Sequence, residues 1–287
     1  MVAHATLTSW TLDPLQLAPL ALGTLAYEWR ARTLSRRGQP VPAWRRGLFW
    51  IAVTLLAVAL VTPLAELAEE DLFVAHMVQH VLLSDLVALA LVASLTGPLL
   101  RPALALRPVA PLRVLAHPLV ALPLWTLNLY IWHVPYLYEA AVRHEAVHAL
   151  QHVSFLTAGA LMWAPVVEVL PGPMWFGTGA KLGYIVAVRL IETVLANVFL
   201  WSGTVFYDVY ARDEAAHGVS ALRDQGLAGT VMMLEGSLVT LGALAWLFLR
   251  LAAEGEQRQE LIERGLDPQA VRRAVRYGRA DELADGG

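Results

Sequence analysis

The sequence predicts an all-α integral membrane protein, built as a bundle of seven transmembrane helices. Hydrophobic residues make up 57% of the 287 residues and charged residues only 16%, whereas soluble domains carry about a quarter charged residues. The mean hydropathy is +0.53, and long apolar runs recur along the whole chain. The sequence contains no cysteine, which excludes disulfides, thiolate metal sites and a cysteine nucleophile.

Seven apolar segments are the candidates for these transmembrane helices. A helix needs about 20 apolar residues to cross the hydrocarbon core of a bilayer. The first segment is short and contains Pro19 and Gly23, so its ends are the least defined. The expected spans cover residues 15–29, 48–64, 72–95, 114–138, 147–167, 182–206 and 226–249.

The distribution of arginines predicts the orientation of the bundle. Arginines are concentrated between the first two spans and after the last one, and the loops on the opposite side contain only Arg143, Arg212 and Arg223. Because basic loops stay in the cytoplasm, we expect the N-terminus outside and the C-terminus in the cytoplasm.

The same pattern predicts two domains. Residues 1–251 would form the seven-span membrane domain, and residues 252–287 would form a cytoplasmic polar tail. The tail is expected to be helical in two pieces, with a break near residues 265–268, where glycine and proline interrupt the helical pattern.

Histidines are concentrated in two stretches of the chain. Residues 132–152, WHVPYLYEAAVRHEAVHALQH, contain four histidines, three of which are spaced i, i+4 and i+8 and so share one helix face. HMVQH, at residues 76–80, repeats the i, i+4 spacing. The expected topology places five histidines near the outer ends of three spans, namely His76, His80, His133, His148 and His152.

Such a cluster predicts a metal or redox-cofactor site, because polar groups inside a bilayer are rare and usually face the bundle interior. Imidazole suits copper, zinc and iron, and a thioether adds a preference for Cu(I). Met232 lies in the last span at the expected depth of His80. The residues therefore favour copper as the cofactor, held by the histidines together with Met232.

Two other sites fit parts of the same pattern. HEAVH, at residues 144–148, matches the motif in which two histidines bind zinc and a glutamate, here Glu145, activates water for proteolysis. His152 or Asp224 could supply the third zinc ligand. Alternatively, a pair of histidines at the outer face could bind one haem.

A second group of polar residues is expected near the middle of the bilayer. Asp85, Glu192 and Glu235 fall there on three different spans. Arg189 stands three residues before Glu192, so the two can form an ion pair on one helix face. The group is either a buried network of satisfied charges or a path for protons or cations.

Ordered motifs along nearly the whole chain carry a resemblance to a known family. HMVQHVLL begins at residue 76, AHPLVA at 116, WHVPYLYEAAV at 132, HALQHVSFLTAGALMW at 148 and DQGLAGTVMM at 224. In these motifs the chain resembles the multispan CtaG-like cytochrome c oxidase assembly factors. The matching polar positions are His76, His80, His133, His148, His152, Asp224 and Gln225.

The resemblance implies a seven-span protein of the bacterial plasma (inner) membrane that is not an enzyme. It implies that the protein binds copper, with Asp224 among the site residues, and delivers it to a subunit of a haem-copper oxidase. A purely structural chaperone of the oxidase is a further possibility. The acidic outer loops, which include Glu69, Glu70, Asp71, Asp213 and Glu214, would face the oxidase or a soluble copper donor.

The chain departs from the family pattern at three places. Asp85 lies in a third span that is otherwise apolar in the family, and Glu235 is an unexpected acid in the last span. Met232 and Met233 stand where the family has methionine followed by tryptophan. These departures leave the role of the deep polar group undefined.

Overall fold

The computed structural model describes residues 10, 14–68, 72–106, 110–210 and 218–285. Within these ranges all regular secondary structure is helical. Of the acidic residues expected to face a partner, five fall outside the described ranges: Glu69, Glu70, Asp71, Asp213 and Glu214.

The chain divides into two compact units. The first comprises residues 1–170 and 193–235, and the second comprises residues 171–192 and 236–287. Two long helices, α10 (Thr178–Trp201) and α12 (Ala221–Glu263), contribute residues to both units. All five candidate histidines belong to the first unit.

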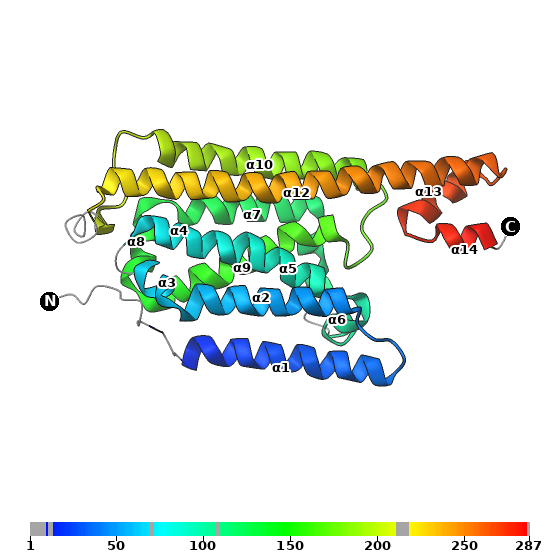
Figure 1. Cartoon of the computed structure of the whole chain (residues 1–287), viewed down its shortest axis with the longest axis horizontal. Helices are drawn as coiled ribbons and strands as arrows, with labels where there is room; N and C mark the ends of the chain where they lie inside the picture. Colours follow the sequence, from blue (N-terminus) through cyan, green and yellow to red (C-terminus); the bar gives the residue numbers. More distant parts are fainter. Residues whose placement is uncertain (1–9, 11–13, 69–71, 107–109, 211–217, 286–287) are drawn as a thin grey trace. The chain divides into compact units, whose positions relative to one another are not determined.

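The first unit contains further helices besides its parts of α10 and α12 (Figure 1). Their bounds are α1 Pro14–Arg36, α2 Ala43–Val61, α3 Pro63–Glu66, α4 Phe73–Val81, the π-helix η2 Leu82–Val87, α5 Ala88–Ser94, α6 Gly97–Leu104, the 3-10 helix η3 Ala110–Ala116, α7 Pro118–Trp132, α8 Pro135–Arg143, α9 Glu145–Val167 and the 3-10 helix η4 Asp208–Tyr210. The structure places α3, α8 and the start of α4 at one end of this unit, the left in Figure 1.

Five helices in the described part of the chain are long and apolar enough to cross a membrane: α2, the continuous helix Phe73–Ser94, α9, α10 and α12. α7 is a shorter apolar helix. These helices indicate a multi-pass membrane protein. The predicted first span corresponds to α1, which continues to Arg36 and ends among arginines.

The predicted fourth span, 114–138, is wrong at both ends. The helix found there is α7, which covers 15 residues. Proline disfavours the α conformation in the residue before it, and both His117 and Val134 precede a proline and are extended. Pro118 therefore begins α7, and Pro135 begins the separate helix α8.

Close packing joins α4, η2 and α9. A Cβ atom placed on Gly159 of α9 would overlap the backbone carbonyl oxygen of Ser84 in η2. Glycine therefore permits the two backbones to approach more closely than any other residue would. The π-helix begins at Leu82, two residues after His80, and such irregular turns are frequent at functional sites.

The second unit contains α13 (Pro268–Arg276) and α14 (Ala280–Asp285). The expected domain boundary at residues 251/252 falls inside α12, which continues to Glu263 without interruption. The predicted break in the tail is confirmed, since Gly265 adopts a φ of +87° between α12 and α13. The predicted pairing of Arg189 with Glu192 is also confirmed, at 3.3 Å.

Candidate metal centre

Two helices of the first unit present four histidine rings to one another. His76 and His80 lie one turn apart on α4, and His148 and His152 lie one turn apart on α9. Ring centroids are 4.1 Å apart within each pair. Across the helices, His76 lies 5.3 Å from His148, and His80 lies 5.5 Å from His152.

Three of these rings could share one metal ion. His76, His80 and His148 each offer one ring nitrogen, and these nitrogens all lie within 4.8 Å of one another. The three side chains are buried, with exposed fractions of 0, 4 and 6%. His152 is half-buried beside them.

The hydrogen bonds of His76 define which nitrogen is available to a ligand. Its Nδ1 lies 3.0 Å from the carbonyl oxygen of Ala68. Because a carbonyl oxygen can only accept, Nδ1 carries the proton and Nε2 keeps its lone pair. Nε2 of His76 and both ring nitrogens of His80 lack a hydrogen-bond partner among the described residues. Such a set of buried imidazole nitrogens is chemically suited to a transition metal.

His133 lies at the margin of this group. It follows the last residue of α7, and its Nδ1 donates to the carbonyl oxygen of Leu129 at 2.6 Å. Its ring contacts Phe155, with centroids 6.1 Å apart, and the ring of His80 also contacts Phe155, with centroids 4.7 Å apart. His133 and the three-histidine group therefore share a contact with the ring of Phe155.

Tyrosines outside the predicted set of site residues support the histidines. The Tyr210 hydroxyl lies 3.1 Å from Nδ1 of His76 and donates to the Ala68 carbonyl at 3.2 Å. The Tyr138 hydroxyl lies 3.0 Å from that of Tyr210, and its ring stacks on Tyr207 at 4.0 Å. Such second partners hold a ligating imidazole in one orientation.

Tyr207 connects this network to His133. Its hydroxyl donates to the backbone carbonyl of His133 at 2.9 Å. Burial, together with neighbouring Tyr210, raises the pKa of Tyr207 above its ordinary value, so the hydroxyl stays protonated and keeps this bond. The concentration of tyrosines in FYDVY, residues 206–210, was the signal available in the sequence.

The structure gives Asp224 a capping role. Its two carboxylate oxygens accept hydrogen bonds from the backbone N–H groups of Phe73 and Val74, at 2.7 and 3.0 Å. These groups belong to the first turn of α4, where N–H groups lack partners within the helix and where negative charge is favourable. The aspartate therefore holds the beginning of the helix that carries His76 and His80.

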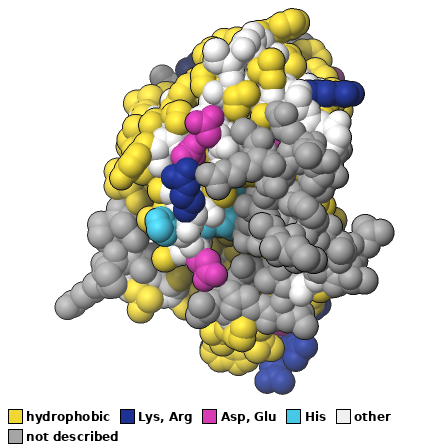
Figure 2. Space-filling view, turned by 90° about the vertical axis from the view of Figure 1, so that its left-hand side faces the viewer, with side chains coloured by type: hydrophobic (Ala, Val, Ile, Leu, Met, Phe, Trp, Pro, Cys, Tyr) yellow, Lys and Arg dark blue, Asp and Glu magenta, His cyan; other side chains and the backbone are white. Residues whose placement is uncertain are grey.

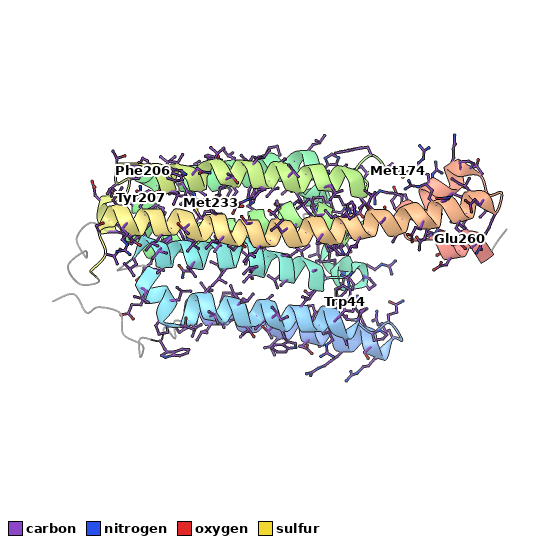
Figure 3. All side chains as sticks on the ribbon, turned by 45° about the horizontal axis from the view of Figure 1, so that its top comes forward. Trp44, Met174, Phe206, Tyr207, Met233 and Glu260 are labelled. Atoms are coloured by element: carbon purple, nitrogen blue, oxygen red, sulfur yellow. The ribbon has the colours of Figure 1, made fainter. Side chains whose placement is uncertain are left out.

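Gln225 makes a second connection at this end of the unit. Its Oε1 accepts from the N–H of Phe206 at 2.9 Å, and its Nε2 donates to the carbonyl of Thr204 at 3.0 Å. Figure 3 shows Phe206 and Tyr207 at the same end as the start of α12, with Met233 further along that helix. Met232, an expected ligand, is also buried on α12, eight residues after Asp224.

The zinc-protease and haem alternatives receive no support. His144 is exposed, and its backbone is extended, at φ −135° and ψ 110°, because it precedes the first turn of α9. It therefore does not share a helix face with His148, and Glu145 is exposed as well.

The expected deep acids are each found in a defined local setting. Asp85 is buried in η2, 3.5 Å from the hydroxyl of Ser84. Glu192 is buried on α10, where Arg189 neutralises it. Glu235 is half-buried on α12.

The end of the first unit that carries the site has a mixed charged surface. Figure 2 looks onto this end and shows histidine side chains beside acidic and basic ones. Arg143 and Glu139 form an ion pair of 2.6 Å on α8, next to the exposed His144. Charged side chains of α8 therefore lie beside the exposed His144.

The fold and the candidate site together describe the class of protein: a multi-pass helical membrane protein with a buried group of imidazoles on two of its apolar helices. The family model described as cytochrome c oxidase caa3 assembly factor matches residues 25–254. The chain belongs to this family of oxidase assembly factors, as the motifs predict. Neither the curated proteins nor the solved structures compared with the chain gave a match.

Proposed function

We propose that this protein binds copper at the group formed by His76, His80 and His148 and delivers it to a subunit of a haem-copper oxidase during assembly. Family membership supports the role in oxidase assembly. The observation that carries the copper proposal is the convergence of three buried ring nitrogens within 4.8 Å, with Nε2 of His76 oriented by the Ala68 carbonyl.

The geometry of the group is close to that of a metal site. Imidazole nitrogens bind zinc at about 2.0–2.1 Å, and imidazole suits copper equally well. Two ligands of one ion therefore lie about 3.3 Å apart in a tetrahedral site. Small rotations of the side chains would bring the three nitrogens from within 4.8 Å to that separation. His152 and His133 would then be neighbours that accept or release the ion.

Metal analysis of the purified full-length protein tests this proposal. After loading with copper and removal of excess metal, we expect about one copper per chain in the wild type. His80→Ala and His148→Ala should lose it, because each removes a ligand. His144→Ala is the matched control, since this exposed histidine precedes α9, four residues before His148, and lies outside the group. Absence of copper and of every other transition metal from the loaded wild type would refute the proposal.

Oxidase assembly in cells separates copper delivery from a purely structural role. In a strain that lacks the protein, His80→Ala should fail to restore oxidase activity, whereas Glu145→Gln should restore it as well as the wild type does. Full activity with both His80→Ala and His148→Ala would favour a structural chaperone. We propose no catalytic step for the protein.

We also propose that the protein lies in the bacterial plasma membrane with its N-terminus outside. Copper from a soluble donor would then enter at the outer end of the bundle. A fluorescent protein fused to the C-terminus should be fluorescent in the cytoplasm, and alkaline phosphatase fused there should be inactive. An active phosphatase fusion would overturn this orientation.

A further inference from the structure

A cavity of about 370 Å³ lies between α1 and the helices α2, α5 and α6 of the first unit. This is within the range of about 300–1,000 Å³ found for pockets that bind small ligands. Its walls are formed mainly by apolar side chains, among them Leu20, Val53, Leu56 and Leu91, and by the backbone of Gly23. Figure 1 shows α1 running alongside α2, one of the candidate membrane spans.

The polar groups along the walls are already bonded within the protein. The Thr24 hydroxyl donates to the carbonyl of Leu20 at 2.8 Å, and the Tyr27 hydroxyl donates to the carbonyl of Ser94 at 3.3 Å. The walls therefore offer a hydrocarbon environment, and a polar ligand would lose its hydration there without compensation.

Arg30 stands at one end of the cavity and differs from these groups. One of its terminal nitrogens donates to the carbonyl of Pro98 at 2.8 Å. Its Nε is buried and lacks a hydrogen-bond partner among the described residues. The guanidinium thus keeps both its charge and a donor for an anion, and guanidinium geometry matches that of phosphate.

The surroundings of Arg30 mark the level of the lipid headgroups. Trp29 and Trp44 are exposed, at 73 and 59%, and tryptophans are enriched at membrane interfaces. Arg45 stacks on Trp44 at 4.5 Å, and Figure 3 shows Trp44 at the beginning of α2. Residues 27–46 contain six arginines and a single acid, Glu28, which is neutralised by Arg46 at 2.9 Å. This end therefore carries net positive charge.

We propose that the cavity binds an anionic phospholipid, with one acyl chain between α1 and α2 and the phosphate at Arg30. The apolar walls match the chain, and the unpaired donor and positive charge match the headgroup. A second copy of the chain fits less well. Two copies inserted in the same orientation would share an axis along the membrane normal, so their arginine-rich ends would lie side by side and repel.

Native mass spectrometry of the full-length protein, released from nanodiscs of phosphatidylglycerol or phosphatidylcholine, tests the proposal. We expect one retained phosphatidylglycerol per chain and weaker retention of phosphatidylcholine. Arg30→Gln should reduce the preference for phosphatidylglycerol about fivefold, the effect of one basic side chain near an anionic lipid. Arg32→Gln, on the same helix but 75% exposed, should retain the wild-type preference.

A second pair of variants tests the apolar part of the site. A Cβ atom at Gly23 meets nothing within 4 Å, so Gly23→Phe should fill the cavity and expel both lipids without displacing a neighbouring group. Gly47 also has open space around it and lies outside the cavity, so Gly47→Phe is the matched control.

Three results would overturn the proposal. The first is an equal loss of preference in Arg32→Gln, which would show general surface attraction. The second is full lipid retention in Gly23→Phe. The third is a dimer in the wild type that Gly23→Phe dissociates. If Gly23→Phe fails to fold, the comparison of Arg30→Gln with Arg32→Gln still decides.

Discussion

The contact of α9 with η2 and the contact of α1 with α2 lie in the same unit but are built in opposite ways. At the first, Gly159 allows the backbones to touch, and any side chain would overlap the Ser84 carbonyl. At the second, Gly23 faces open space and the helices leave a cavity. Close backbone packing is thus found at the helices that carry the histidine rings, whereas the contact between α1 and α2 leaves space for a lipid chain.

The largest effect should come from Gly159→Ala. The added methyl group must push α9 away from η2, and overpacking of this kind costs about 1–3 kcal/mol or more. Because α9 carries His148, copper binding should fall together with stability. Thermal unfolding in detergent measures the first effect and metal analysis the second. Gly226→Ala is the control, since a Cβ there meets nothing within 4 Å; equal melting temperatures for the two variants would contradict the packing argument.

Asp224→Ala should have the next largest effect. It leaves the N–H groups of Phe73 and Val74 without their acceptors, and removal of a helix cap costs about 0.5–2 kcal/mol. A lower melting temperature with one copper still bound would confirm that the aspartate positions α4 and is not a ligand. Asp208→Ala, an exposed acid in η4, should melt like the wild type. Complete loss of copper without loss of stability would instead make Asp224 a ligand.

Tyr210→Phe should weaken copper binding more than it weakens the fold. It removes the hydroxyl that contacts Nδ1 of His76, and loss of a second-shell partner lowers metal affinity by about 10–100-fold. We expect a loss of copper affinity near the lower end of this range, because the Ala68 carbonyl still accepts a hydrogen bond from Nδ1 of His76. Competition with a copper chelator measures the affinity. Tyr136→Phe, on the 81% exposed tyrosine of α8, should bind copper like the wild type, and a matching loss there would refute the positioning role.

The smallest effect should come from Tyr27→Phe at the α1–α2 contact. The ring would keep its stacking on Phe49, whose centroid lies 3.6 Å away, and would lose only the 3.3 Å bond to the Ser94 carbonyl. A hydrogen bond of this kind contributes about 0.5–1.5 kcal/mol. The melting temperature should fall slightly and copper binding should not change. A change in copper binding would show that the two regions are coupled.

Local spacing predicts part of the geometry of the candidate site. The i, i+4 pairs on α4 and α9 follow from helix geometry, and the depth of the spans placed both pairs at one end of the bundle. The structure brings ring nitrogens of His76, His80 and His148 within 4.8 Å of one another, whereas His133 is outside this group and contacts Phe155.

The rest of the site depends on contacts between residues far apart in the sequence. Asp224 caps a helix 150 residues earlier in the chain, and no local pattern distinguishes such a cap from a metal ligand. Tyr210 reaches His76 from a segment that reads as a loop. The π-helix η2 occupies a run that reads as an ordinary apolar helix, because its wider turn is compatible with the same residues.

The composition of the three-histidine group has a consequence for how long a copper ion would stay. The described group contains imidazoles and no carboxylate. The carboxylate of Asp224 instead accepts hydrogen bonds from the first turn of α4. Neutral ligands leave the charge of the ion uncompensated in a buried site, and that charge is costly where the dielectric is low. Monovalent copper would be tolerated better than divalent copper. A copper ion bound only by neutral imidazoles would be released readily to an acceptor that offers a negatively charged ligand. Such release suits a protein that delivers copper better than one that stores it.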